Sequence, residues 1–362
     1  MAKFEGIVWA DKQIRFSLAD KTTELLEADA KIASCSRSTN YAIFLAFEGI
    51  RFFCRTGAGG RPELLFLNWR KNLERFRRGM AFNIGADQER LVPSVEDLET
   101  LFIRRYFAAP EMSPFLKEMM ALGAQGYLRP FTVDEEQSIG VTFPNQPAIR
   151  ALACRYDRYM GEPFGGVVVP HLVRAVTANG TGCLKLGVNY LISVKAIEAA
   201  RKIWSEAASA LFLDDRPDRP IEERFVTEWD SYCCLFALKD GTVIKIPENP
   251  LILPSITIQG MVLILRHLGV PVEERPVSYG ELLGRVRAGE LAAICSVGTA
   301  GILNRCAKLL LTDGKGGIAA THTPDEKHPL YAKLAEARAY YWDIYREKVP
   351  PLAGMDLYRY QL

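Results

Sequence analysis

The pattern of hydrophobic and polar residues alternates between strand-like and helix-like segments along the whole chain. Short apolar runs rich in β-branched and aromatic residues predict strands at 40–54 and in GYLRPFTV, LFLD, FVTEWDSYCCLFALKDG, TVIKIP and ELAAICSVGTA. Apolar positions with helical spacing predict helices at 69–83, 94–108, 189–206 and 329–347, and in MSPFLKEMMALGAQG and ITIQGMVLILRHLG. Helices and strands are intermixed throughout, so the pattern predicts an α/β or α+β fold.

Two local signals mark boundaries in this pattern. Pro93-Ser94, with Asp97 three residues after the serine, is typical of a capped helix start. The stretch 155–168 is rich in Gly and Tyr and contains a proline, which favours a linker between domains. A chain of 362 residues is long enough for two domains, and we expect a smaller one at 1–154 and a larger one at 169–362.

Charge and composition exclude several classes of partner. The chain has 45 Lys and Arg against 43 Asp and Glu, a net charge of +2, so neither nucleic acid nor an anionic membrane is an expected partner. No apolar run approaches the roughly 20 residues of a membrane-spanning helix. The start, MAKFEGIVWADKQ, lacks the apolar core of a signal peptide, and we expect a cytoplasmic protein. The basic run at 70–78 is interpreted as a solvated helix face.

Residues that commonly build metal, redox or nucleotide sites do not form the required patterns. The eight cysteines contain no C-x-x-C pair, and we expect them to be reduced and buried. The four histidines lack metal-ligand spacing, so no metal site is predicted. GAGG and DGKGG match neither the P-loop nor the dinucleotide pattern and are interpreted as turns, and no G-x-S-x-G occurs.

The segment TGCLKLGVNYLISVKAIEAARK at 181–202 carries the main chemical signal. A single lysine, Lys185, lies between Leu184 and Leu186 in a strand-like run, and a glycine, an Asn-Tyr pair and a helix follow. Taken alone, such a lysine is expected on an edge strand in solvent, because lysine is mostly exposed.

The segment resembles the K-x-G-G-N-Y element of the branched-chain aminotransferases, which are pyridoxal-phosphate enzymes of fold type IV. Other motifs of that family are matched in the family's order over residues 40–305, namely F-E-G at 47–49, N-L-E-R-F at 72–76, Y-L-R-P at 127–130, T-E at 227–228, L-P-S-I-T at 253–257 and G-T-A at 298–300. Each match alone is weak, whereas the ordered set is specific. The resemblance implies the two-domain fold of type IV, with a small N-terminal α/β domain and a larger C-terminal domain of mixed sheets.

The resemblance also assigns a cofactor and the residues that bind it. It implies that Lys185 carries pyridoxal 5'-phosphate as an imine and later moves a proton, and that Glu228 faces the ring nitrogen. Tyr190 is expected to contact the phenolic oxygen. The phosphate is expected to meet the amides of Ile256 and Thr257, the Thr257 hydroxyl and Thr299, because LPSIT precedes a predicted helix whose N-terminus suits an anion.

The same resemblance places the substrate. It assigns Tyr127 and Arg129 to the substrate end, where an arginine can bind a carboxylate at two points. It also assigns Ala300, Ser231 and Tyr159 to the pocket. The implied activity is amino-group transfer between a branched-chain or other hydrophobic amino acid and a 2-oxo acid, carried out by a homodimer.

The chain departs from the family pattern around this pocket. Asn68 stands where the family has an arginine that binds the cofactor phosphate, so a neutral hydrogen bond replaces a charged one, and Arg70 could compensate only in a shifted strand. Such a loss is expected to weaken cofactor binding by roughly one to two powers of ten. Further departures are at Val188, Cys233, Ile258, Asn304 and Arg305.

These departures suggest a divergent member of the family, with a place in a specialised biosynthetic pathway. Two alternatives to transamination stay open. One is a fold-type IV enzyme with a lyase, racemase or other outcome, and the second is a cofactor-poor binding protein without activity.

Overall fold

The alternation of strand and helix patterns folds into two units, each with its own sheet. The structure is a computed structural model that describes residues 4–159, 163–174 and 180–362. Phe4–Tyr159 form one unit together with Leu184–Val188 and Met355–Leu362, and we call it the N-terminal unit. The rest of the described chain, up to Gly354, forms the C-terminal unit. The segment predicted as a linker contains a strand of the C-terminal unit, β9 (Phe164–Val168).

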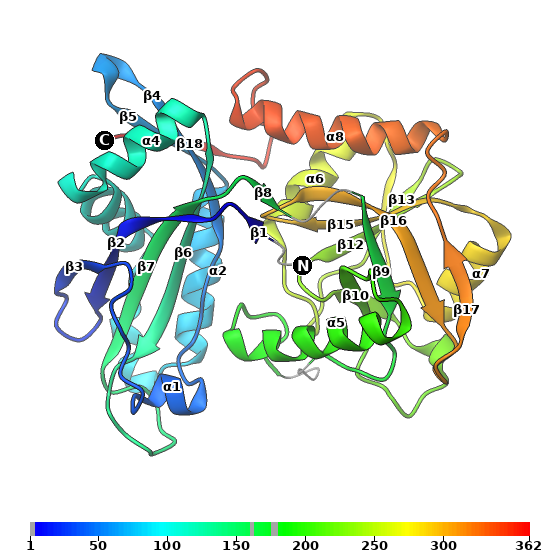
Figure 1. Cartoon of the computed structure of the whole chain (residues 1–362), viewed down its shortest axis with the longest axis horizontal. Coiled ribbons are helices and arrows are strands. Elements are labelled where there is room, and N and C mark those ends of the chain that lie inside the picture. The colour runs from blue at the N-terminus through cyan, green and yellow to red at the C-terminus, as the bar shows by residue number, and fades with distance from the viewer. Residues whose placement is uncertain (1–3, 160–162, 175–179) are drawn as a thin grey trace. The chain divides into compact units, whose positions relative to one another are not determined.

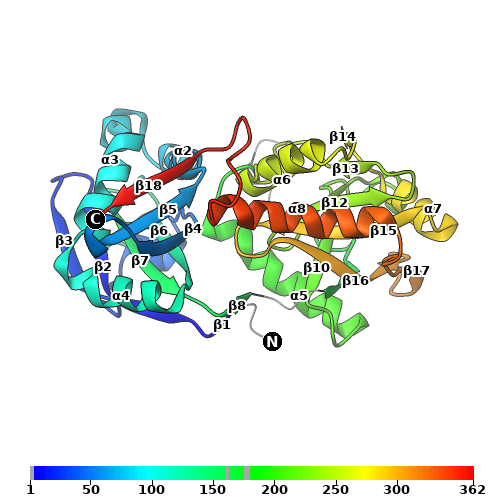
Figure 2. The same ribbon diagram turned by 90° about the horizontal axis from the view of Figure 1, so that it is seen from above.

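The described residues of the N-terminal unit form a seven-stranded antiparallel sheet in the order β18-β5-β4-β6-β7-β2-β3. The strands are β2 (Val8–Ser17), β3 (Thr23–Glu27), β4 (Ile50–Thr56), β5 (Pro62–Leu67), β6 (Gln125–Asp134), β7 (Pro147–Arg155) and β18 (Leu357–Gln361). A two-residue ladder joins β1 (Phe4–Glu5) to β8 (Arg158–Tyr159). Strand β18, near the C-terminus, pairs with β5 and forms one edge of the seven-stranded sheet of the N-terminal unit (Figure 2).

The helices of the N-terminal unit bury aromatic and aliphatic side chains against this sheet. They are α1 (Arg37–Tyr41), α2 (Trp69–Phe82), α3 (Val95–Glu99), the π-helical turn η3 (Thr100–Phe107) and α4 (Ser113–Leu122). In α2, Leu73, Phe76 and Met80 are buried at helical spacing. The predicted capped start at Ser94 is confirmed, since its hydroxyl accepts the Asp97 amide at 3.0 Å.

The prediction of strand over 40–54 is correct only from Ile50 onward. The preceding residues contain helix α1 and two residues with positive φ, Ala42 and Phe44. Ala46 and Phe47 form isolated bridges instead of a continuous ladder. An apolar run was therefore not enough to predict a strand here. The backbone changes direction, and Ala46 and Phe47 pair with two different segments, at Leu186 and at Phe131.

The C-terminal unit contains a mixed sheet whose described strands run in the order β11-β10-β9-β16-β15-β12-β13-β14, with β17 also paired to β16. The strands besides β9 are β10 (Ser209–Leu213), β11 (Val226–Trp229), β12 (Cys233–Leu238), β13 (Val243–Lys245), β14 (Val272–Glu274), β15 (Leu291–Gly298), β16 (Ile302–Thr312) and β17 (Ile318–His322). Within it, β9 is parallel to β10 and β16, and β13 is parallel to β14.

Helices cover the strands of the C-terminal unit (Figure 1). They are α5 (Leu191–Ile203), α6 (Ile256–His267), α7 (Tyr279–Ala288) and α8 (Pro329–Tyr345). Helix α5 packs on β9 and β10, whereas α6 and α8 pack on each other and on β15. The predicted helices at 189–206, after LPSIT and at 329–347 are confirmed to within a few residues, and the fold class is confirmed as mixed α/β.

Candidate active site

Lys185 lies in an irregular segment of the N-terminal unit, not in the predicted strand. The only strand-like pairing beside it, within the described chain, is an isolated bridge between Leu186 and Ala46. The Lys185 carbonyl accepts a hydrogen bond from the Phe47 amide at 3.0 Å. Its side chain is half-buried, which contradicts the expectation of a lysine in open solvent.

The Lys185 amine and the Arg129 guanidinium both approach the ring of Phe47. The Lys185 Nζ lies 5.0 Å from the ring centroid and the Arg129 Cζ lies 4.8 Å from it. An aromatic face attracts both cations without neutralising them. The structure thus brings the predicted catalytic lysine and the predicted substrate arginine to one ring.

Arg129 keeps its charge available for an anion. Its guanidinium donates to the Tyr127 hydroxyl at 3.1 Å and lies 5.1 Å from the Tyr127 ring centroid. No carboxylate pairs with Arg129 among the residues that the structure describes. A half-buried guanidinium of this kind suits a carboxylate ligand.

Tyr127 is held in an aromatic cluster at the end of the sheet. Its ring lies 5.9 Å from that of Phe4 and 6.3 Å from that of Tyr156. Tyr159, predicted to close over the substrate, packs against Phe4 at 4.7 Å between ring centroids. Gly49 leaves room for the Tyr127 hydroxyl, since a Cβ on Gly49 would come within 1.8 Å of that oxygen.

Glu48, the residue before Gly49, forms a buried ion pair with Arg75. Glu48 is 0% exposed and Arg75 is 5% exposed. Arg75 Nε donates to Glu48 Oε2 at 2.7 Å, and Arg75 Nη2 donates to Oε1 at 2.6 Å. Burial raises the pKa of Glu48, but Arg75, Lys185 and the Gly49 amide outweigh it and hold that pKa below its usual value. The interpretation of 70–78 as a solvated face is therefore wrong for Arg75.

Asn68 connects the start of helix α2 to the backbone of Asp356. It precedes α2 with a left-handed φ of 57°, a conformation that asparagine tolerates better than most residues. Its Oδ1 accepts the Asp356 amide at 3.1 Å, and its own amide donates to the Asp356 carbonyl at 2.7 Å. These bonds join the start of α2 to the segment before β18. Its predicted contact with a phosphate stays a prediction.

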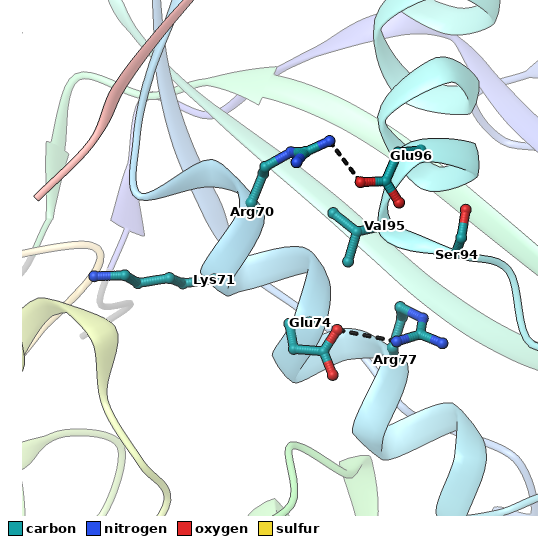
Figure 3. Close-up of a pocket in the computed structure, with 7 residues that line it drawn as sticks. All are labelled: Arg70, Lys71, Glu74, Arg77, Ser94, Val95 and Glu96. Atoms are coloured by element: carbon teal, nitrogen blue, oxygen red, sulfur yellow. Dashed lines mark hydrogen bonds and ion pairs between the residues drawn. The ribbon is translucent and has the colours of Figure 1, made fainter. Parts of the chain in front are cut away.

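The basic residues at the start of α2 line an open pocket with acidic neighbours (Figure 3). Arg70 donates to Glu96 at 2.7 Å and to Glu99 at 3.2 Å, and Arg77 pairs with Glu74 at 3.0 Å. The charge of Arg70 is thus already compensated, so it does not replace the arginine missing at position 68.

In the C-terminal unit, the predicted ring-nitrogen carboxylate is buried beside an arginine. Glu228, on β11, is 4% exposed, and Arg174 is 5% exposed. Arg174 Nη1 donates to the Glu228 carboxylate, to the Gly182 carbonyl at 3.4 Å and to the Leu251 carbonyl at 3.2 Å. Its guanidinium also lies 5.9 Å from the centroid of the Tyr190 ring. Glu228 and Tyr190, predicted to contact the same cofactor, therefore both adjoin Arg174.

Arg174 was missed by the sequence reasoning. It stands in HLVRAV, which has neither a motif nor a periodicity, and nothing in that stretch distinguishes it from a surface arginine. Its burial and its bond to Glu228 become visible only in the folded structure.

The segment LPSIT, predicted to bind the phosphate, leads into helix α6, as expected. Ser255 caps α6, and its hydroxyl accepts the Ile258 amide at 3.3 Å. Helix geometry leaves the amides of Ile256 and Thr257 without intrahelical acceptors, which makes this terminus suitable for an anion. Thr257 is buried. The donors present fit a phosphate group.

The remaining predicted residues lie in turns of the C-terminal unit. Thr299 and Ala300 connect β15 to β16, directly after Gly298. Ser231 is exposed in the turn between β11 and β12, where its hydroxyl bonds the Asp230 carboxylate at 2.8 Å. Their assignment to a cofactor or substrate stays a prediction.

Relatives in sequence agree with the motif evidence. No protein-family model matches the chain. The chain is 28% identical over 291 residues to a probable branched-chain-amino-acid aminotransferase of Staphylococcus aureus (strain N315), covering 79% of this chain and 74% of the relative. It is 24% identical over 288 residues to branched-chain-amino-acid aminotransferase 2 of Bacillus subtilis (strain 168), covering 79% and 73%.

The fold is shared with solved structures of the same name. The branched-chain amino acid aminotransferase from Escherichia coli superposes with a TM-score of 0.66 at 18% identity, over 96% of this chain and 98% of that one. A T.th. branched-chain amino acid aminotransferase with pyridoxamine 5'-phosphate also gives a TM-score of 0.66, at 19% identity over 95% and 97%. At this identity the likeness to the solved structures shows the fold alone. The chain thus has the fold of the type IV pyridoxal-phosphate enzymes, and over most of its length its sequence is similar to those of branched-chain aminotransferases.

Proposed function

We propose that the protein is a pyridoxal-phosphate-dependent aminotransferase that moves an amino group between a hydrophobic, branched-chain type of amino acid and a 2-oxo acid. The observation that carries this proposal is the placement of Lys185 and Arg129 at the Phe47 ring. An amine that can carry the cofactor and a guanidinium that can bind a substrate carboxylate are the two groups that the reaction requires side by side. The names of the relatives in sequence support the substrate class.

The residues present fit pyridoxal 5'-phosphate. When bound, this cofactor supplies an electron sink that stabilises negative charge at the substrate Cα. Lys185 would hold it covalently and then move a proton at Cα. Glu228, which accepts a hydrogen bond from Arg174, would accept the hydrogen bond of the protonated ring nitrogen. The first amides of α6 would bind the phosphate, and Arg129 would bind the substrate carboxylate.

The proposal is tested with purified protein, added cofactor, L-leucine and 2-oxoglutarate. We expect visible absorbance from the lysine-bound cofactor and formation of glutamate. The Lys185→Ala variant should lose that absorbance and lower the rate roughly a thousandfold or more. Lys202→Ala is the matched control, because that lysine is on α5 with 75% of its side chain exposed.

Two results would contradict the proposal. One is a wild-type protein that shows no cofactor absorbance at any cofactor concentration, and the other is full activity in Lys185→Ala. Decarboxylated, racemised or cleaved products in place of glutamate would instead identify a different reaction of the same cofactor.

We infer that the protein is a homodimer. The loop between β6 and β7 exposes three apolar side chains, Ile139, Val141 and Phe143, at 84%, 74% and 59%. Neighbouring exposed apolar side chains of this size are typical of an interface. Replacing all three with serine should convert a dimer to a monomer in light scattering, whereas Leu122→Ser, at an equally exposed position on α4, should not. A wild-type monomer would overturn the inference.

We also place the protein in the cytoplasm. All eight cysteines are free, and most are buried, which is typical of a reducing compartment. No described helix is long and apolar enough to cross a membrane. Fractionation of the native host with an antibody against this chain tests the location.

A further inference from the structure

A cavity in the N-terminal unit, which we call the edge cavity, lies at the edge of the sheet formed by β2 and β3. Its volume of about 310 Å³ is at the lower end of the range of small-molecule sites, roughly 300–1,000 Å³. In the sheet, β2 and β7 lie between β3 and β6, the strand that carries Tyr127 and Arg129. The edge cavity is therefore separate from the predicted substrate residues of this unit. Among the residues that line it are Phe16, Lys21, Asp97, Thr100, Leu101 and Arg105.

The π-helical turn η3 forms one wall of the edge cavity. A π-helix closes i→i+5 hydrogen bonds, so its turns are wider than those of an α-helix, and this rare form is frequent at functional sites. The wider turn brings Thr100, Leu101 and Arg105 to one face, where all three line the cavity. In a regular α-helix, Thr100 and Arg105 would lie about 140° apart around the axis. The unusual helix thus gathers a hydroxyl, an apolar side chain and a guanidinium at this wall.

Lys21 reaches the edge cavity from the turn between β2 and β3, where its backbone is strained. Its φ of 59° lies in the left-handed region, which lysine rarely adopts and which glycine and asparagine tolerate better. Its Nζ lies 5.9 Å from the centroid of the Phe16 ring and donates to the Leu91 carbonyl at 3.3 Å. Strained residues of this kind gather at ligand-binding positions, so the placement of this amine favours a binding site.

The edge cavity offers charges of both signs next to apolar surface. Lys21 and Arg105 pair with no carboxylate among the residues that the structure describes. Asp97 is exposed, and both of its side-chain hydrogen bonds with Ser94 use Oδ2, at 2.8 and 3.2 Å. Its Oδ1 can therefore accept a donor from a ligand. The buried side chain of Leu101 supplies apolar surface beside these groups.

We propose that the edge cavity binds a free α-amino acid with an apolar side chain, as a second site apart from the active site. The ligand carboxylate pairs with Lys21 and Arg105, and its ammonium group donates to Asp97. Its side chain packs on Phe16 and Leu101. A 2-oxo acid or a simple amine satisfies only one of the two kinds of charge, whereas an amino acid satisfies both. The inference does not depend on the proposed aminotransferase activity.

Equilibrium dialysis of radiolabelled L-leucine against the full-length chain tests the proposal. The Arg129→Met background, without added cofactor, removes the carboxylate contact of the candidate active site, and we expect one bound leucine per chain. Arg105→Gln and Asp97→Asn should each raise the dissociation constant about tenfold, because each removes a charged hydrogen bond. Arg104→Gln is the matched control, since Arg104 is also exposed on η3 but does not line the cavity.

The variant Lys21→Asn separates binding from folding. Asparagine tolerates the left-handed conformation, so this variant should melt no lower than the parent and yet bind L-leucine about tenfold more weakly. Three competitors test the class of ligand. In 4-methyl-2-oxopentanoate the amino group is missing, in 3-methylbutylamine the carboxylate, and in glycine the side chain. Each should compete about tenfold less well than unlabelled L-leucine.

No saturable binding of L-leucine up to about 10 mM would overturn the proposal, and so would binding that Arg105→Gln and Asp97→Asn leave unchanged. An equal loss in Arg104→Gln would also overturn it, because the effect would then not come from the cavity. Competition by the 2-oxo acid as strong as that by L-leucine would remove the role of Asp97 and with it the amino acid as the ligand. Failure of the aminotransferase proposal would instead appear as missing cofactor absorbance in the wild type, whatever the dialysis shows.

Discussion

Each unit of the protein buries a glutamate of one of the matched motifs beside an arginine, and these two pairs are built differently. In the N-terminal unit, Arg75 lies on α2 and donates from two nitrogens to the two oxygens of Glu48. In the C-terminal unit, Arg174 lies outside regular structure and divides one nitrogen between Glu228 and two backbone carbonyls. A forked pair fixes the orientation of both side chains, whereas the divided donor also ties Arg174 to the backbone at Gly182 and Leu251.

This difference matches the role that we propose for Glu228. Both oxygens of Glu48 accept hydrogen bonds from Arg75. Glu228 is expected to accept a protonated ring nitrogen in addition to Arg174. We therefore expect the cofactor to act on the Glu228 pair and not on the Glu48 pair, and variants of each pair test this.

The largest expected effect comes from breaking the Glu48–Arg75 pair. Arg75→Met leaves a buried carboxylate without its cation and should lower the free energy of unfolding by about 3–5 kcal/mol at pH 7 in urea titrations. The Glu48→Leu, Arg75→Met double variant should recover most of that loss. A single variant as stable as the wild type would show that the pair contributes nothing to the fold.

The pH dependence of the same variant follows from the sign of the pKa shift. The folded-state pKa of Glu48 is lowered, so its contribution is present above its unfolded pKa and is lost as pH falls through the folded value. In Arg75→Met the buried Glu48 lacks its cation, so its pKa in the folded state should lie above its pKa in the unfolded state. The stability difference between variant and wild type should therefore shrink as the pH falls, first above about 4.5 as Glu48 of the variant binds its proton, and then below it as the wild type loses its ion pair.

Acid should weaken the C-terminal unit earlier, through His322. Burial lowers the pKa of this histidine to about 4, from 6.5. The unfolded state then binds more protons between those values, so stability is full above pH 6.5 and falls as the pH drops toward 4, by about 3 kcal/mol. His322→Phe should remove that slope, and His171→Asn, at an exposed position, should keep it. An unchanged slope in His322→Phe would assign the acid sensitivity elsewhere.

The Glu228–Arg174 pair should respond to cofactor. Arg174→Met removes the protein's own cation beside Glu228, and a bound protonated ring nitrogen can then replace it. We expect saturating cofactor to stabilise Arg174→Met by about 2 kcal/mol more than it stabilises the wild type. Arg75→Met should gain no such excess, so thermal scans of the two variants with and without cofactor compare the pairs directly. Equal gains in both variants would contradict the contrast.

The sequence predicted neither of these pairs as a pair, although it assigned Glu228 to the cofactor ring nitrogen. F-E-G and N-L-E-R-F contained Glu48 and Arg75, yet Arg75 was interpreted as a solvated residue because charge runs usually are. Arg174 had no local signal. Helices with strong periodicity and caps, such as α2 and α6, were predicted well, since their pattern is local. Lys185 was identified by resemblance, but its irregular backbone and its contact with Phe47 depend on segments more than a hundred residues away in the chain.

The smallest expected effect concerns Gly49, which adjoins both Glu48 and Tyr127. A substitution there separates substrate binding by Tyr127 and Arg129 from the ion pair of Glu48. A Cβ at Gly49 would lie 1.8 Å from the Tyr127 Oη, so Gly49→Ala should displace that ring and break its bond to Arg129. The Gly49 amide, which donates to Glu48 at 2.8 Å, is retained. We expect the substrate KM to rise about tenfold, with little change in kcat. Gly284→Ala, where a Cβ meets open space in α7, should leave KM unchanged. An unchanged KM in Gly49→Ala would mean that Tyr127 does not hold Arg129 in place for the substrate carboxylate.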